Sequence, residues 1–423
     1  MLKRWRGVGA WLATVLLAGC NGLSVNFIQT PGWYELRLGP VDDITVQAVA
    51  REGRAVYRIG IPERRNLRLN QPVRVPHGEA HMVEEEGGSV LELTLPSLYK
   101  TDAKVERGMG TVRLLFAPPK RVEDVGPGGF ARTVQAWAGP EGVHSIYAVK
   151  VPRRQLDLMK VVLAGDKLGA RGTVKELAPG CLVAINGGFF DPGNGMPLGA
   201  LRLGEEWVSA PRLGRTCLIV GKTGPRILNV QWQAAVKAGG ATLPVDAFNG
   251  NPPQGGSCVV TTRRWSPDKP FAGFSTTAAG GGLTVHHRAP LKGEPSVTLT
   301  VQPEVEGSVL GAGPRLVEAA EVHLTADEEQ FKPGVTRGLA ARSGVGINPD
   351  DALWLAFAEA CPPFSCGVTL ADFAQFFQAL GCVSAMNLDG GLSAQLVVAG
   401  ELVGRPAPGG PAKVANALVV SAR

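Results

Sequence analysis

The segment of residues 385–394, AMNLDGGLSA, combines the side chains and the backbone freedom of a ligand site. An apolar run leads into Asn387 and Asp389, and the glycine pair Gly390 and Gly391 follows. This pattern predicts a buried strand that brings an amide and a carboxylate to a tight turn, with a second strand behind it. Because glycine has no side chain, a ligand could approach the backbone beside Asp389 closely. An ordinary hairpin turn is the alternative interpretation.

A second segment, residues 184–192 (AINGGFFDP), repeats this order of residue types. Asn186 and the pair Gly187 and Gly188 follow an apolar run, and Asp191 comes shortly after them. Two corners of the same type in one chain indicate two walls of a single pocket rather than two unrelated turns.

Together the two corners resemble the phosphodiester glycosidase family. The resemblance extends over residues 130–423 and is strongest in the segments 184–192, 196–199, 311–317, 342–346 and 364–393. It implies a mixed α/β domain that cleaves the glycosidic bond of a sugar-1-phosphodiester. The sequence departs from the family pattern at Leu392, where a third glycine is common, and at Ser343, where threonine is usual. These departures leave open the alternative that the protein has lost catalysis and only binds its ligand.

Glycosidic cleavage normally needs one carboxylic acid to protonate the leaving oxygen and one carboxylate to activate water or attack the sugar. A phosphate monoester leaves readily, so one well-placed carboxylate and strong anion recognition could suffice. We expect Asp389 to be the principal carboxylate, with Asp191 and Glu359 as candidates for a second. Arg342 is expected to hold the phosphate through two parallel hydrogen bonds. A turn role for Asp191 and a structural ion pair for Arg342 are the alternatives.

The other expected binding groups are amides. Asn186 and Asn387 would hydrogen-bond to sugar hydroxyls or to the phosphate. The peptide N–H groups of the two glycine pairs would form an anion-binding nest, made by Gly187, Gly188, Gly390 and Gly391.

Several other functions lack their sequence patterns. The chain has no G-x-S-x-G segment, no Walker A loop and no dinucleotide fingerprint, so no cofactor is expected. The net charge of +6 comes from scattered basic residues without a recognition motif, which argues against nucleic-acid binding. We expect no metal site, although a metal-dependent phosphodiesterase remains an alternative to the glycosidase.

The elements that position these residues are expected to be short strands joined by turns, because 56 glycines and 32 prolines occur among 423 residues. We predict an α+β protein with a small antiparallel β-sandwich over residues 25–118, a linker over 119–129 and a mixed α/β domain over 130–423. The sandwich faintly resembles AMIN modules, which would make peptidoglycan a partner.

Two helices are expected in the second domain. The segment 173–176 has the capping-box pattern of a short helix, with Thr173 and Glu176 at its ends. A longer helix is predicted from Thr369, capped with Asp372, to Leu380.

Residues 1–20 are expected to be a lipoprotein signal peptide. Basic residues precede a short apolar run, and the segment 17–20, LAGC, ends in Cys20. Cleavage before Cys20 and acylation of its sulfur would anchor an exported protein to the cell envelope. A plain secretory peptide is the alternative.

The six other cysteines permit disulfides in an exported protein. Cys361 and Cys366 flank a turn-like insert and are the expected local bridge. Three pairings of the other four cysteines remain open.

Overall fold

The structure, a computed structural model, describes residues 142–265, 271–362 and 365–422 without a break. Before residue 142 it describes the strands β1 to β13 together with Ile44, Glu86 and Phe130. Cys20, the expected site of acylation, lies outside the described residues. Within the described part of the chain, no helix is long and apolar enough to cross a membrane.

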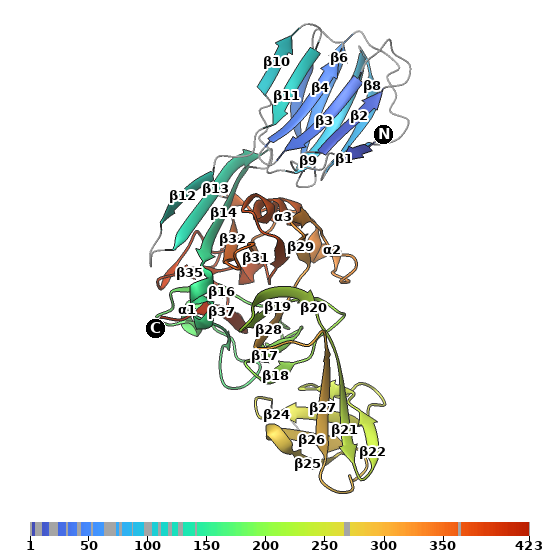
Figure 1. The fold of residues 1–423 in the computed structure, drawn as a ribbon, viewed down its shortest axis with the longest axis vertical. Coiled ribbons are helices and arrows are strands. Elements are labelled where there is room, and N and C mark those ends of the chain that lie inside the picture. The colour runs from blue at the N-terminus through green and yellow to red at the C-terminus, as the bar shows by residue number, and fades with distance from the viewer. Residues whose placement is uncertain are drawn as a thin grey trace.

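The N-terminal part consists of two antiparallel sheets at one end of the molecule (Figure 1). The first has the order β1 (Leu2–Arg4), β2 (Trp11–Leu16), β3 (Ser24–Thr30), β4 (Trp33–Gly39), β11 (Thr111–Phe116) and β10 (Lys104–Gly108). The second has the order β5 (Thr45–Arg51), β6 (Arg54–Pro62), β9 (Gly88–Pro96), β8 (Gly78–Glu85) and β7 (Val73–Val75). β1 and β2 fall within the segment expected to be a signal peptide.

A large antiparallel sheet forms the centre of the remaining chain. Its order is β12 (Arg121–Val125), β13 (Ala131–Gly139), β14 (Gly142–Val151), β32 (Leu353–Cys361), β31 (Arg342–Ile347), β34 (Ser384–Asn387), β29 (Arg315–Glu318) and β30 (Glu321–Val322). The short strand β33 (Ser365–Cys366) also pairs with β32. β12 lies in the segment expected to be a linker, so this sheet begins before residue 130.

Two smaller sheets pack against the central one. One has the order β15 (Met159–Leu163), β37 (Asn416–Val420), β16 (Val183–Asn186), β35 (Leu396–Val398) and β36 (Glu401–Leu402). The other has the order β18 (Glu206–Ser209), β17 (Leu201–Leu203), β28 (Ser308–Gly311), β19 (Thr216–Gly221) and β20 (Gly224–Asn229). A single apolar cluster joins the three sheets, as Phe357, Ile185 and Leu310 illustrate.

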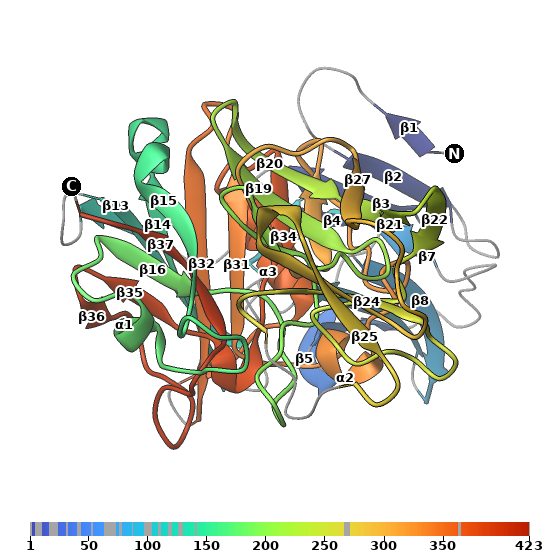
Figure 2. The same cartoon turned by 90° about the horizontal axis from the view of Figure 1, so that it is seen from below.

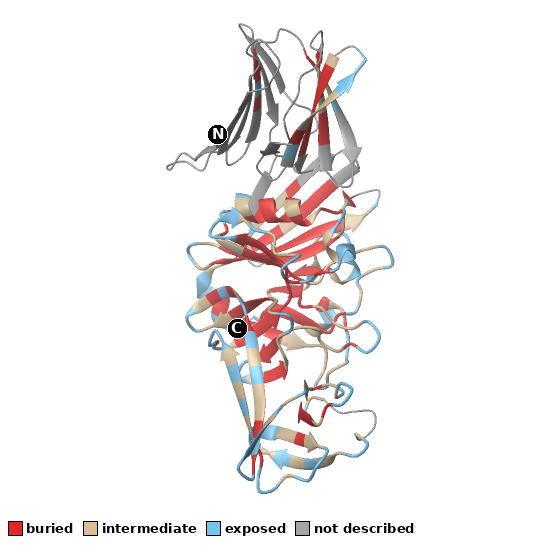
Figure 3. Ribbon diagram, turned by 90° about the vertical axis from the view of Figure 1, so that its right-hand side faces the viewer, coloured by how far each residue is buried: buried red, intermediate tan, exposed pale blue. Residues whose placement is uncertain are grey.

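A peripheral β-subdomain extends from the far end of this body (Figure 1). A ribbon of β21 (Gln231–Ala238), β22 (Ala241–Pro244) and β27 (Ser296–Gln302) leads into it. A second sheet follows, with the order β23 (Ala247–Phe248), β24 (Cys258–Thr262), β26 (Leu283–His287) and β25 (Ser275–Ala279). Figure 3 shows that buried residues dominate the body, whereas much of this subdomain is exposed.

The expected α+β class, with a mixed α/β second domain, is wrong. The described chain is mostly strand, and every strand pair in it is antiparallel except β23 with β24. Its α-helices are α1 (Val174–Leu177), α2 (Pro333–Thr336) and α3 (Leu370–Ala379). The apolar runs are short and separated by Gly- and Pro-rich turns, so consecutive strands fold back on one another without crossover helices.

The two predicted helices form where their caps predict them. Thr173 and Glu176 make a complete capping box at α1, and Thr369 and Asp372 make another at α3. α3 packs its phenylalanines on the face of the central sheet opposite to β16, β35 and β37 (Figure 2). The glycines of β31 allow this approach, because a Cβ on Gly346 would lie 2.5 Å from the Phe377 ring.

No disulfide joins the six cysteines of the described residues. Cys361 and Cys366 lie on the paired strands β32 and β33 without being bonded to each other. The other four are buried in four different apolar clusters, which keeps them apart: Cys181, Cys217, Cys258 and Cys382. Burial raises the pKa of the Cys217 thiol to about 12, as expected for a cysteine that packs as a small apolar side chain.

Candidate active site

The two Asn–Gly–Gly corners lie together because of how their strands pair. β16 enters the first corner, and β35 leaves the second; the two strands are antiparallel neighbours, with Ala184 opposite Val397. β34, which enters the second corner, belongs to the central sheet instead. The second corner is therefore a crossing between two packed sheets, and the hairpin interpretation does not apply.

Direct hydrogen bonds join the corners. The Asn186 side chain donates from Nδ2 to the backbone oxygen of Asp389 at 2.7 Å. The Asp389 N–H donates to the Gly187 oxygen at 3.0 Å. Asn186 is fully buried, and its Oδ1 also accepts from the Gln395 N–H at 3.0 Å. Asn186 thus fixes the backbone on both sides of the second corner and contacts no solvent.

The first corner requires glycine because other chain segments touch it. A Cβ on Gly187 would lie 2.0 Å from Asn416 Oδ1, and one on Gly188 would lie 2.2 Å from the Gly311 oxygen. Asn416 also accepts both corner amides, from Gly187 N at its backbone oxygen and from Gly188 N at Oδ1. Sequence reasoning missed Asn416, whose place at the start of the last strand gave no signal of this contact.

The second corner is built in the same way. Gly390 packs on the Ala341 oxygen, and Gly391 has a positive φ of 59° and donates to that oxygen at 2.8 Å. The Gly390 N–H is a hydrogen-bond donor to the Asp389 carboxylate. Since all four glycine amides already have protein acceptors, the expected anion-binding nest is not available in this conformation.

Asp389 carries the carboxylate of the site and is partly exposed. Burial raises the pKa of its carboxyl to about 6, while hydrogen bonds from Ser393 and from the Gly390 N–H oppose that rise. The side chain of Leu392, three residues after Asp389 in the chain, is 65% exposed. A carboxyl whose pKa is raised toward neutral pH is typical of groups that take part in acid–base chemistry.

Two buried polar atoms beside Asp389 lack hydrogen-bond partners among the described residues. They are Asn387 Oδ1 and Ser343 Oγ. The residues belong to adjoining strands, and the Leu388 N–H donates to the Ser343 oxygen at 2.8 Å. Gly344, and not Ser343, lies opposite Asn387 in the strand register, so the two side chains point to opposite faces of the central sheet and do not line one site.

Arg342 does not face the corners. Its guanidinium donates to three backbone oxygens, those of Val335 at 2.7 Å, Gly338 at 3.2 Å and Val368 at 3.3 Å. Burial lowers the pKa of Arg342 to about 10, and the charge of Asp372 opposes this. The side chain thus ties α2 and the segment after it to the start of β31, an interior strand of the central sheet.

The two candidates for a second carboxylate are both engaged elsewhere. Asp191 Oδ1 accepts from the Gly193 N–H at 2.8 Å, which is the geometry of its own turn. Glu359 is 1% exposed, and its carboxylate accepts from the Arg405 N–H at 2.8 Å. Glu359 also raises the pKa of Tyr147, after the larger effect of burial on that phenol.

A buried carboxylate that sequence reasoning missed supports the site from behind. Glu329 accepts from the Thr216 N–H at 2.9 Å and from the Arg315 N–H at 3.0 Å. These bonds fix the segment that contains Gly313, whose oxygen accepts from Asn387 Nδ2 at 3.1 Å. Nothing in the sequence distinguishes Glu329 from the acidic residues just before it.

Arg215 was also missed. Its guanidinium lies 4.1 Å from the centre of the Phe331 ring, and Phe331 in turn contacts Phe189 of the first corner with ring centres 5.5 Å apart. Nε donates to the Glu329 backbone oxygen at 3.3 Å. The two terminal nitrogens make no hydrogen bond with the described residues, so they are available to an anion.

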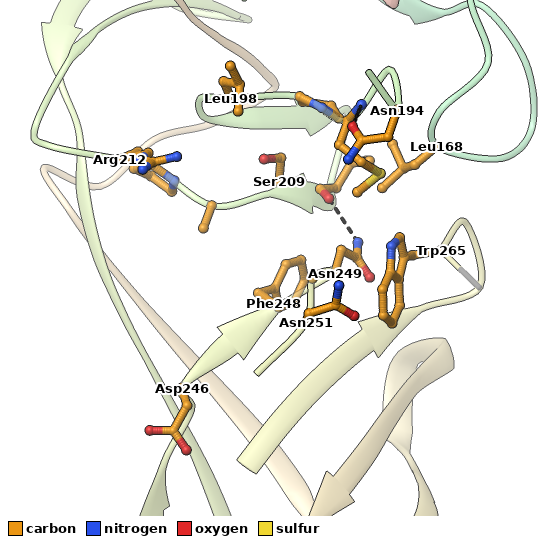
Figure 4. A pocket seen from close by; sticks show the side chains of 16 residues that line it. Leu168, Asn194, Leu198, Ser209, Arg212, Asp246, Phe248, Asn249, Asn251 and Trp265 are labelled. Carbon is orange, nitrogen blue, oxygen red and sulfur yellow. Dashed lines mark hydrogen bonds between the residues drawn. The ribbon is translucent and has the colours of Figure 1, made fainter. Parts of the chain in front are cut away.

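A pocket of about 620 Å³ opens beside the loop that leaves the first corner, not at the corners themselves (Figure 4). None of the sequence-predicted site residues lines it. Its walls come from the body and from the peripheral β-subdomain. The corners and this pocket are therefore separate features, connected through residues 189–198.

Residues 231–421 match the family model described as phosphodiester glycosidase. The second corner and Arg342 fall within that range, whereas the first corner precedes it. Over this range the chain is similar in sequence to that family. No curated protein matches the chain.

Two solved structures share the fold, and a third shows a weaker similarity. A hypothetical protein from Synechocystis has a TM-score of 0.62 at 19% identity, covering 100% of this chain and 83% of its own. A Burkholderia pseudomallei K96243 protein described as exported has a TM-score of 0.52 at 15% identity, covering 99% of this chain and 97% of its own. The catalytic domain of zebrafish N-acetylglucosamine-1-phosphodiester alpha-N-acetylglucosaminidase has a TM-score of 0.39 at 18% identity, covering 72% and 82%.

Proposed function

We propose that this chain, whose residues 231–421 match the phosphodiester glycosidase family, is a hydrolase that cleaves the glycosidic bond of a sugar-1-phosphodiester. One observation carries the proposal. The hydrogen bond from Asn186 Nδ2 to the Asp389 oxygen joins two sequence-distant corners around a single carboxyl whose pKa is raised to about 6.

In the proposed reaction Asp389 acts in its ionised form. Its carboxylate takes a proton from the attacking water while the phosphate monoester leaves with the bonding electrons, or it attacks the anomeric carbon itself, and water then cleaves the resulting glycosyl ester to release the sugar and restore the carboxylate. A phosphate leaving group needs little protonation, so no second buried acid is required.

Arg215 is the proposed partner of the phosphate, in place of Arg342. Its terminal nitrogens have no hydrogen bonds with the described residues, and desolvation lowers its pKa. A cation in that state gains more from pairing with a phosphate than a fully hydrated one does.

Asp389→Asn tests the assignment. We expect release of free sugar from a synthetic sugar-1-phosphodiester to fall by roughly 100-fold or more, the usual effect of removing an acid–base group. Asp157→Asn, on an exposed residue, is the matched control. A sugar phosphate as product, together with chelator sensitivity, would point to a metal-dependent phosphodiesterase instead.

The same variant has a stability signature. The pKa of Asp389 is raised above its ordinary 3.8, so the folded protein holds this proton more tightly than the unfolded chain. The stabilising effect of the protonated form is present at low pH and is lost as the pH rises through about 6. At pH 7 we therefore expect Asp389→Asn to raise the free energy of unfolding by roughly 1–3 kcal/mol.

A non-catalytic glycan-binding protein is the second candidate. The saturated glycine amides favour it, since they offer no ready site for a transition-state charge. It predicts no turnover of any sugar phosphodiester and unchanged ligand binding in Asp389→Asn.

We propose the cell envelope as the location, with the lipid on Cys20 as the anchor and the N-terminal sheets as a contact for peptidoglycan. Metabolic labelling with a radioactive fatty acid should mark the wild type and not Cys20→Ala. Absence of label from the wild type would contradict the anchor without affecting the hydrolase assignment.

A further inference from the structure

The pocket of about 620 Å³ beside the first corner has the size of an ordinary ligand site and plays no part in the chemistry above. It lies at the junction of the body and the peripheral β-subdomain. Residues 194–198 and 208–212 contribute from the body, and residues 246–251 and Trp265 contribute from the subdomain. Figure 4 shows these two groups facing each other across the opening.

The aromatic wall of this pocket is Trp265, which packs on Phe271. The Trp265 ring stacks on Phe271 with ring centres 5.6 Å apart and planes at 23°. The preceding residue is clamped to the body, since the Leu168 N–H donates to the Arg264 oxygen at 2.9 Å and Arg264 Nε donates to Glu206 at 3.0 Å. An indole fixed in this way offers a flat apolar surface at little entropic cost.

The floor of the pocket includes Asn249, whose side chain is held by hydrogen bonds. Asn249 is 4% exposed, has a positive φ of 47°, and donates from Nδ2 to the Val208 oxygen at 2.8 Å. Its Oδ1 accepts from the Thr262 N–H at 2.7 Å. Asn249 therefore has no spare hydrogen bonds and serves to join the subdomain to β18.

The mouth offers polar groups that are not engaged. Among the described residues, the side chains of Asn251, Ser209 and Arg212 make no hydrogen bond. Asn194 uses only its Oδ1, which accepts from the Met196 N–H at 2.9 Å, and so its NH₂ group is available. Amide, hydroxyl and guanidinium groups around a flat apolar wall complement a ring that carries hydroxyls on its edges.

We propose that this pocket binds a saccharide unit, with the C–H face of a pyranose packed on Trp265 and its hydroxyls bonded to Asn251, Asn194 and Ser209. The proposal rests on the proposed function, because it makes the pocket a subsite for glycan beyond the bond that is cut. The connection to the corner is a single loop, closed by the Leu198 N–H donating to the Phe189 oxygen at 2.9 Å.

Calorimetric titration of the full chain with defined tetrasaccharides tests this directly, using glucose, mannose, N-acetylglucosamine and galacturonate tetramers as probes. We expect at least one to bind saturably, and Trp265→Ala to weaken that binding by at least tenfold. Trp265→Phe should restore part of it. Asn251→Ala, on an exposed residue that cannot unfold the protein, should weaken binding severalfold.

The control is Lys237→Ala, on an exposed residue of β21 outside the pocket, which should bind as the wild type does. The subsite is overturned if none of the four tetramers binds, or if Trp265→Ala and Asn251→Ala both bind as tightly as the wild type. Binding without release of sugar from any 1-phosphodiester leaves the subsite standing and removes the hydrolase. Release of sugar without tetramer binding removes the subsite and leaves the hydrolase assignment standing.

Discussion

At the scale of single residues, the site depends on the environment of one carboxyl group. Asp389 is enclosed enough to raise its pKa to about 6, yet it keeps two hydrogen bonds that favour its ionised form. A carboxyl tuned in this way can exchange a proton near neutral pH, which an exposed aspartate with a pKa near 4 does poorly.

Variants of two arginines distinguish a structural role, expected for Arg342, from a role in phosphate binding, expected for Arg215. Arg342→Lys should lower the free energy of unfolding by about 2–4 kcal/mol, because an ammonium group cannot reproduce three hydrogen bonds to fixed carbonyl oxygens. The KM of Arg342→Lys should be close to that of the wild type.

Arg215→Lys should raise KM about tenfold with little loss of stability. Chemical denaturation and steady-state kinetics check both; a raised KM in Arg342→Lys alone would return the phosphate to Arg342.

The residue types of the site could be predicted from sequence, but their directions could not. Asn186, Asn387 and Asp389 stand at strand ends, as their patterns indicate. Arg342 begins a strand in which alternate side chains face opposite sides, and its side is fixed by the backbone oxygens of Val335, Gly338 and Val368, which come from other segments. Arg215 and Glu329 become neighbours through contacts between distant segments, which no local pattern records.

At the scale of elements, the corners work as crossings between packed sheets. β16 and β35 are paired, and β34 belongs to the opposite sheet, so the backbone between β34 and β35 must pass over the end of the core. Glycines allow this passage at van der Waals distance from Asn416, Gly311 and Ala341.

Gly188→Ala tests this geometry. Its Cβ would meet the Gly311 oxygen at 2.2 Å, a backbone atom that cannot move aside cheaply. We expect a loss of roughly 2–4 kcal/mol in stability and a large loss of turnover. Gly334→Ala, where nothing lies within 4 Å, is the control and should change neither. Thermal unfolding and a turnover assay measure the difference, and a fully stable Gly188→Ala protein would contradict the close contact.

Local rules predicted the helices better than the fold class. The capping boxes at Thr173 and Thr369 form as their spacing indicates, since each depends only on residues three apart. The α/β expectation failed because strand partners are chosen by long-range pairing. β14 lies beside β32, some 200 residues away, and no crossover helix is needed between antiparallel neighbours.

At the scale of the whole molecule, the chain is a β-rich body with sheets at both ends (Figure 1). The peripheral β-subdomain is an insertion whose two ends meet in one ribbon, with Ala235 opposite Thr298. Its own small core includes Val236, Val260 and Val285, separate from the core of the body.

Replacement of residues 236–297 by an Asn-Gly turn should therefore leave the body folded. The two flanking strands are already antiparallel partners, so a two-residue turn can join them. We expect cleavage of a small sugar-1-phosphodiester to stay within about threefold of the wild type, with tetrasaccharide binding lost. Circular dichroism, calorimetry and the turnover assay check this. Loss of the small-substrate reaction in a folded variant would show that the subdomain belongs to the catalytic centre.

The most direct test of the account is the pH dependence of kcat/KM for the wild type and for Ser393→Ala. If ionised Asp389 drives hydrolysis, the wild-type rate should fall on the acid side with an apparent pKa near 6. Removing the Ser393 hydroxyl takes away a bond that favours the ionised form, so the acid limb should move to higher pH in the variant. An acid limb at the same pH in both proteins, or none between about pH 5 and 7, would contradict the assignment of Asp389.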